Sequence, residues 1–141
     1  MINKLLTELK TELNSKHKEN FTGLVLFGSY AKGVQNKNSD VDLIVSFKKL
    51  PKNRKEKISY LFDIIFPLEE KYGIEINPLV CESKNLKKTI LATEISDYAK
   101  IIVDKKGFFK KLFDSIKNDF KEGIFEKIQR NSFHILKFKN V

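Results

Sequence analysis

Two aspartates and a small-residue turn, set at a fixed spacing, are the residues of this 141-residue chain that best suit a chemical reaction. Gly28 and Ser29 follow one apolar run, and Asp40 and Asp42 open the next after ten intervening residues. Residues two apart on a strand point to the same face, so we expect the two carboxylates side by side. Mg²⁺ prefers such oxygen ligands and usually keeps phosphate oxygens in its shell. The spacing therefore predicts a site for Mg²⁺, as two ions, and a nucleoside triphosphate.

Gly28 and Ser29 are the candidates for binding the phosphates. Glycine has no side chain and tolerates unusual dihedral angles, so its backbone can approach a ligand closely. Ser29 adds a hydroxyl and a backbone N–H at the expected start of a short helix, where an anion is favoured. Lys32 and Lys37 are close enough in sequence to reach a triphosphate, although loop lysines at such positions are more often solvated.

Apolar periodicity predicts the elements that position these residues. We expect helices over residues 2–18, 29–32, 54–71, 84–95 and 107–134, and strands over residues 23–28, 41–47, 74–80 and 99–103. Strands alternating with helices indicate an α/β (α+β) domain. Pro78 suggests that the third strand lies at a sheet edge or ends there. The last segment carries an apolar stripe and predicts a long C-terminal amphipathic helix.

The composition predicts a globular, soluble chain, because 41% of its residues are hydrophobic and 32% are charged. No apolar run approaches the roughly 20 residues of a membrane span. The N-terminal residues lack the apolar core of a signal peptide. Cys81 is the one cysteine and cannot form an internal disulfide, so we expect a cytoplasmic protein.

Positive charge and phenylalanine both concentrate at the C-terminus. The net charge is +9, and residues 105–141 hold ten Lys/Arg against four Asp/Glu. We therefore divide the chain into residues 1–104 and a basic, Phe-rich extension over residues 105–141. Its apolar surface suits packing on the same domain, on a second copy in a homodimer, or on a helical partner. Direct binding of nucleic acid is a weaker reading that would require a steep salt dependence.

The segment GSYAKGVQNKNSDVDL resembles the signature of the nucleotidyltransferase superfamily that includes DNA polymerase beta. Within it, the short chain resembles the minimal nucleotidyltransferases, or MNT proteins. The resemblance is specific over residues 22–47 and looser over residues 54–103. It implies a small mixed sheet flanked by helices, two Mg²⁺ ions, and transfer of a nucleoside monophosphate from an NTP. It also implies that Gly28 and Ser29 bind phosphate and that Asp40 and Asp42 bind metal.

Many MNT proteins are antitoxins paired with HEPN toxins, and some attach AMP to a toxin tyrosine. The resemblance therefore implies an enzyme that moves AMP from ATP onto a hydroxyl of a partner protein. Two alternatives remain open: a non-catalytic antitoxin with a vestigial nucleotide site, and a small-molecule nucleotidyltransferase.

The family usually has a third carboxylate on a later strand, and here the chain departs from its pattern. Glu75 and Asn77 share one face of the expected third strand. Glu75, as the one acid there, is our candidate for the third catalytic and metal-binding carboxylate. If Asn77 holds that position instead, a neutral amide replaces the base and catalysis is weak.

The remaining polar candidates are expected to be structural. His17 follows a helix among charged residues, so we expect it at the surface, and His134 lies in the tail; neither has a second histidine or cysteine nearby, so zinc is not expected. Cys81 suits a small buried apolar position. Tyr30 and Tyr98 have the chemistry to stack on a base or to accept AMP, but packing is the commoner role.

Overall fold

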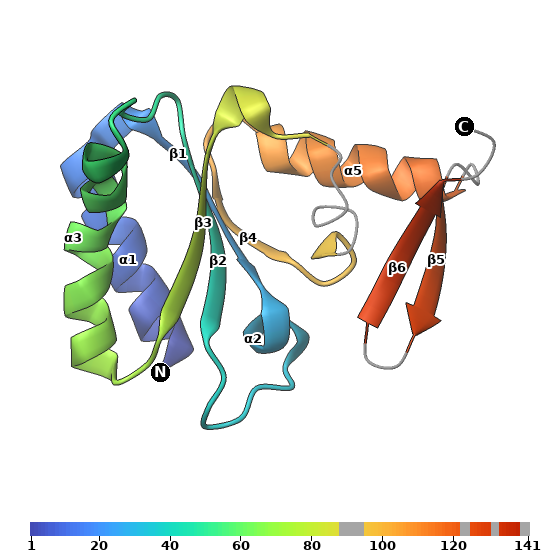
Figure 1. The fold of residues 1–141 in the computed structure, drawn as a ribbon, viewed down its shortest axis with the longest axis horizontal. Helices are drawn as coiled ribbons and strands as arrows, with labels where there is room; N and C mark the ends of the chain where they lie inside the picture. Colours follow the sequence, from blue (N-terminus) through green and yellow to red (C-terminus); the bar gives the residue numbers. More distant parts are fainter. Residues whose placement is uncertain (88–94, 122–124, 131–132, 139–141) are drawn as a thin grey trace.

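The computed structural model describes residues 1–87, 95–121, 125–130 and 133–138, with the backbone alone from residue 120 onward. A four-stranded mixed sheet in the order β3-β2-β1-β4 forms its centre (Figure 1). The strands are β1 (Phe21–Phe27), β2 (Val41–Phe47), β3 (Ile76–Glu82) and β4 (Lys100–Asp104). β1 runs antiparallel to β2 and β4, whereas β2 and β3 are parallel. The expected α/β class and mixed sheet are therefore confirmed.

Helices cover both faces of the sheet. α1 (Ile2–His17) and α3 (Arg54–Tyr72) lie on one face, and α5 (Phe108–Lys121) lies on the other (Figure 1). α2 (Gly28–Lys32) follows β1, and the 3-10 turns η1 (Lys18–Asn20) and η2 (Ser83–Asn85) follow α1 and β3. None of the helices in the described part of the chain is long and apolar enough to cross a membrane.

The two faces of the sheet bury different apolar clusters. The larger cluster joins leucines of α1 and α3 to inward residues of β1 and β2: Leu5, Leu9, Leu13, Leu61, Leu24, Leu43. The smaller one joins α5 to the opposite face: Val25, Ile44, Phe109, Phe113, Ile116. Each central strand thus faces apolar side chains on both sides, which explains why β1 and β2 are nearly continuous apolar runs.

β3 is an edge strand that lacks free N–H donors over its first three residues. Residues of a parallel strand direct their backbone groups alternately toward one neighbour and the other. Glu75 C=O accepts from Val41 N–H at 2.8 Å, so Ile76 and Pro78 direct their backbone groups to the open edge. Ile76 N–H donates to Glu69 Oε2 at 2.8 Å, and Pro78 has no N–H. The open edge therefore offers no free N–H donor from Ile76 to Pro78, and the edge position expected from Pro78 is confirmed.

The C-terminal region differs from its expected single helix. α5 ends at Lys121, and β5 (Phe125–Arg130) and β6 (Phe133–Phe138) pair as an antiparallel hairpin. The prediction of a helix through residue 134 was wrong. Phe125 and Ile128 are three residues apart, a spacing that favours a helix, but so short a run does not decide between a helix and a strand. The helix expected over residues 84–95 lies largely outside the described residues.

Candidate active site

Gly28 brings the end of β1 directly against Asp42. Its φ of 73° lies in the left-handed region, and a Cβ added there would collide with Asp42 Oδ2. Phe27, the last residue of β1, is paired with Asp42 in the strand register. Only glycine meets both requirements at this position, because an L side chain would be strained and would displace the carboxylate.

The loop between α2 and β2 delivers Asp40 and Asp42 to the same end of the sheet. Gly33 ends α2 in the left-handed conformation, with φ 75°. A local turn then forms, in which Asn38 N–H donates to Asn36 Oδ1 at 2.8 Å and Asn36 N–H donates to Ser39 Oγ at 2.9 Å. Such hydrogen bonds between side chains and the local backbone stabilise a turn without contacts from another helix or strand.

Asp42 points away from the larger apolar cluster, as its spacing predicts. Val41 and Leu43 are fully buried in the larger cluster, while Asp42 is half-buried on the other face. Desolvation raises the pKa of Asp42, a hydrogen bond from Asn77 opposes this rise, and the nearby charge of Asp40 adds to it. The site thus holds its carboxylates at a free-energy cost when no cation is present.

Both residues proposed for the third position approach the aspartate pair. Asn77 is paired with Asp42 in the β2–β3 register, and its Nδ2 donates to Asp40 Oδ2 at 3.0 Å. Glu75 lies just before β3, where the charge of Asp40 and a hydrogen bond to its side chain raise the pKa of Glu75. The amide therefore occupies the strand position beside Asp42, while the carboxylate faces Asp40.

The donor set fits a hard cation that shares its shell with phosphate. Two carboxyl groups in hydrogen-bond contact need a proton or a cation between them, as the raised pKa of Glu75 reflects. Within the described residues, no three His, Cys, Asp or Glu side chains are grouped so as to hold a metal on their own. Mg²⁺ usually binds through one or two carboxylates and completes its shell with water and substrate phosphates, which agrees with this arrangement.

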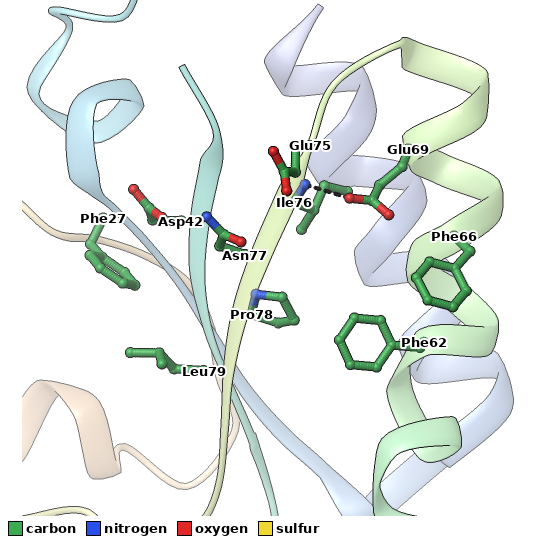
Figure 2. Close-up of a pocket in the computed structure, with 10 residues that line it drawn as sticks. All are labelled: Phe27, Asp42, Phe62, Phe66, Glu69, Glu75, Ile76, Asn77, Pro78 and Leu79. Atoms are coloured by element: carbon green, nitrogen blue, oxygen red, sulfur yellow. Dashed lines mark hydrogen bonds between the residues drawn. The ribbon is translucent and has the colours of Figure 1, made fainter. Parts of the chain in front are cut away.

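A cavity of about 540 Å³ opens beside Asp42 and extends around the start of β3 to α3 (Figure 2). Its lining combines acids and an amide with apolar side chains: Asp42, Glu69, Glu75, Asn77, Phe27, Phe62, Phe66, Pro78, Leu79. Glu69 also accepts the bond from Ile76 N–H that holds β3 in place, drawn as a dashed line in Figure 2.

The sequence did not single out Glu69, Phe66 or Leu79 as site residues. Phe66 lies off the apolar stripe of its helix, and its side chain is 59% exposed. An apolar residue on the polar face of a helix is the sequence signal that could have identified Phe66. Ile58 on the same helix is another exposed apolar residue, at 51%.

The other expected candidates take structural positions. Lys32 Nζ lies 4.4 Å from the centre of the Tyr98 ring, Lys37 is an exposed loop residue, and Tyr30 packs on the larger cluster. Burial raises the pKa of Cys81 to about 11, so its thiol stays protonated at neutral pH.

His17 was expected at the surface, but it stacks on Tyr60 with ring centres 3.9 Å apart. The side chain of His134 lies outside the described residues.

Comparison with known proteins agrees with this geometry. The nucleotidyltransferase domain family matches residues 6–131. A Methanocaldococcus jannaschii protein named "Putative protein adenylyltransferase MJ1305" is 38% identical over 120 residues, which cover 83% of this chain and 82% of that protein. A second protein of the same description and organism, MJ0141, is 32% identical over 67% of this chain and 91% of its own length.

Two solved structures share the fold. One is a toxin–antitoxin complex with AMP-PNP, matched at 15% identity and a TM-score of 0.54 over 81% of this chain and 86% of that chain. The other is the MntA-HpeT toxin–antitoxin mutant D39ED41E, matched at 16% identity and a TM-score of 0.55 over 85% of this chain and 86% of that chain. At these identities the likeness shows the fold alone.

Proposed function

Because this chain belongs to the nucleotidyltransferase domain family and is a nucleotidyltransferase, we propose that it transfers AMP from ATP to a hydroxyl of a partner protein, with Mg²⁺. The observation that carries this proposal is the position of Asp42 between the Gly28 corner and an open cavity, with Asp40 bonded to the neighbouring Asn77. Relatives named as protein adenylyltransferases support AMP and a protein acceptor.

The partner proposed here is a toxin, with a HEPN-type toxin as the class that the MNT resemblance implies. Structural neighbours that come from toxin–antitoxin complexes support this choice. Asn77 in register with Asp42 is the observation that favours the alternative, a partner-binding protein with a weak or vestigial nucleotide site.

Each residue of the site has a distinct role in the proposed reaction. Gly28 and Ser29 bind the terminal phosphates through backbone N–H groups and the serine hydroxyl. Asp40 and Asp42 would hold Mg²⁺, which would neutralise the triphosphate and the leaving pyrophosphate, and Glu75 faces Asp40 as the base.

The acceptor oxygen forms a bond to the α-phosphorus as the bond from that phosphorus to the bridging oxygen breaks. Pyrophosphate leaves with the electron pair of the broken bond. The hydroxyl proton passes to the Glu75 carboxylate.

The test is incubation of the protein with ATP labelled at the α-phosphate, Mg²⁺ and the purified product of the neighbouring gene. We expect label on that partner protein, none from ATP labelled at the γ-phosphate, and none with Asp42→Asn or with EDTA. A stable complex that carries no label would contradict transfer and establish the binding alternative. Label on a small-molecule hydroxyl in place of the protein would contradict the protein acceptor.

A further inference from the structure

The cavity beside Asp42 lies on the side from which an acceptor must approach. Gly28 contacts one side of Asp42, and β3 flanks the other, because β2 lies between β1 and β3. In-line displacement places the attacking oxygen opposite the leaving pyrophosphate. If the terminal phosphates lie at Gly28, the acceptor hydroxyl arrives from the β3 side, where the cavity opens.

An aromatic pair from α3 lines this cavity. The rings of Phe62 and Phe66 are tilted by 33° with centres 5.1 Å apart, and Pro78 lines the same side of β3 (Figure 2). Phe66 is 59% exposed, so much of its ring is left in water. Aromatic side chains of this kind gain free energy when a partner side chain covers them.

The acidic lining of the cavity and the lack of free N–H donors at the start of β3 limit what can bind there. Glu69 and Glu75 line the cavity near the start of β3 (Figure 2), so the cavity is acidic although the whole chain carries a net charge of +9. Ile76 N–H is already bonded to Glu69 and Pro78 has none, so an added β-strand lacks donors there. A side chain inserted from a partner segment fits these constraints better than strand addition does.

We propose that this cavity is the acceptor subsite, and that it binds an apolar side chain lying next to the acceptor hydroxyl on a basic segment of the partner polypeptide. Phe66 and Phe62 are then residues that determine acceptor specificity. Burial of the exposed Phe66 ring supplies affinity, and the two glutamates favour lysine or arginine nearby. This inference rests on the proposed nucleotidyl transfer to a protein.

A peptide library tests the inference. Peptides with a central Tyr, Ser or Thr and randomised flanks are incubated with the protein, Mg²⁺ and ATP labelled at the α-phosphate. We expect labelled peptides to be enriched in an apolar residue near the acceptor and in Lys or Arg. Phe66→Ala should remove the apolar preference and raise KM for the best peptide about tenfold, with kcat and Mg²⁺-ATP binding unchanged.

Ile58→Ala is the matched control, since Ile58 is a similarly exposed apolar residue of α3 that does not line the cavity. It should leave both the preference and KM unchanged. The inference is overturned by labelling without apolar preference, by a preference that survives Phe66→Ala, or by an equal loss in Ile58→Ala. It is also overturned if the whole partner protein is labelled and no peptide is. If neither is labelled, the proposed function itself fails.

Discussion

The two sides of Asp42 differ in the space they leave. On the β1 side, Gly28 is so close that a single added Cβ would collide with the carboxylate. On the β3 side, Asn77 and Glu75 are exposed and a cavity of about 540 Å³ opens. The difference teaches that the phosphate side is defined by backbone geometry, which tolerates no variation. The acceptor side is defined by side chains, which can vary with the partner.

The largest effect on nucleotidyl transfer is expected at Asp42, which lies between the β1 side and the β3 side. Asp42→Asn removes one charge from the proposed metal ligands and should lower nucleotidyl transfer by about a thousandfold. Turnover with labelled ATP measures it. Full activity in this variant would end the metal-site assignment.

The same variant should not lower the stability of the metal-free protein. The pKa of Asp42 is raised by desolvation in the folded state, so its contribution to stability is present at low pH and is lost as pH rises through the raised pKa. At neutral pH the ionised carboxylate therefore costs stability. Asp42→Asn should raise Tm or leave it unchanged without Mg²⁺, whereas a fall in Tm would show that the carboxylate is structural.

Substitution of Gly28 tests the claim that no space is left between Gly28 and Asp42. Gly28→Ala should lower the free energy of unfolding by about 2–3 kcal/mol and transfer by about a hundredfold, because strain and collision act together. Gly33→Ala is the matched control, with a similar φ of 75° and no atom within 4 Å of the added Cβ. It should cost about 1 kcal/mol from backbone strain alone. Equal effects in the two variants would refute the close-contact argument.

Substitutions of Glu75 and Asn77 test which of the two residues fills the third catalytic position. Glu75→Gln should lower kcat by about a hundredfold with little change in Tm, because Glu75 is exposed and is proposed to accept the proton of the acceptor hydroxyl. Asn77→Ala removes the bond to Asp40 and should have the smaller effect on kcat. The reverse order would move the third role to Asn77 and favour the vestigial site.

The smallest effect is expected at the opposite end of β2, far from both sides of Asp42. His17 packs on Tyr60 and Phe47, and desolvation is the largest cause of its lowered pKa. Its stabilising contribution is full above its ordinary pKa of 6.5 and is lost as pH falls through the lowered value in the folded state. His17→Gln should flatten the fall of Tm over this range and leave transfer unchanged. Parallel Tm curves for the two proteins would contradict it.

Local patterns predicted the elements around the site well. β2 was expected over residues 41–47 and spans Val41–Phe47, because alternating Asp42 with buried Val41 and Leu43 allows one face assignment only. Gly33 and Gly73 both end their helices in the left-handed conformation. These features depend on neighbours within a few residues, so the sequence carries them directly.

Features that depend on residues far apart in the sequence could not be predicted from these local patterns. The hairpin after α5 replaced a helix, because pairing of Phe125–Arg130 with Phe133–Phe138 outweighed the apolar spacing used to predict it. Glu69 and Phe66 reach the cavity from α3 because α3 packs beside β3, a contact that helical periodicity does not encode.

The sequence by itself determined the chemical groups of the candidate site, since Gly28, Ser29, Asp40 and Asp42 lie within one continuous β1–α2–β2 segment. Only the tertiary structure decided what faces them. The parallel register of β2 and β3 places Asn77 beside Asp42 and leaves Glu75 to Asp40. A shift of β3 by one residue against β2 would turn Asn77 and Glu75 to the opposite face of the sheet. Burial of Ile76 and Val41 in the core excludes that shift.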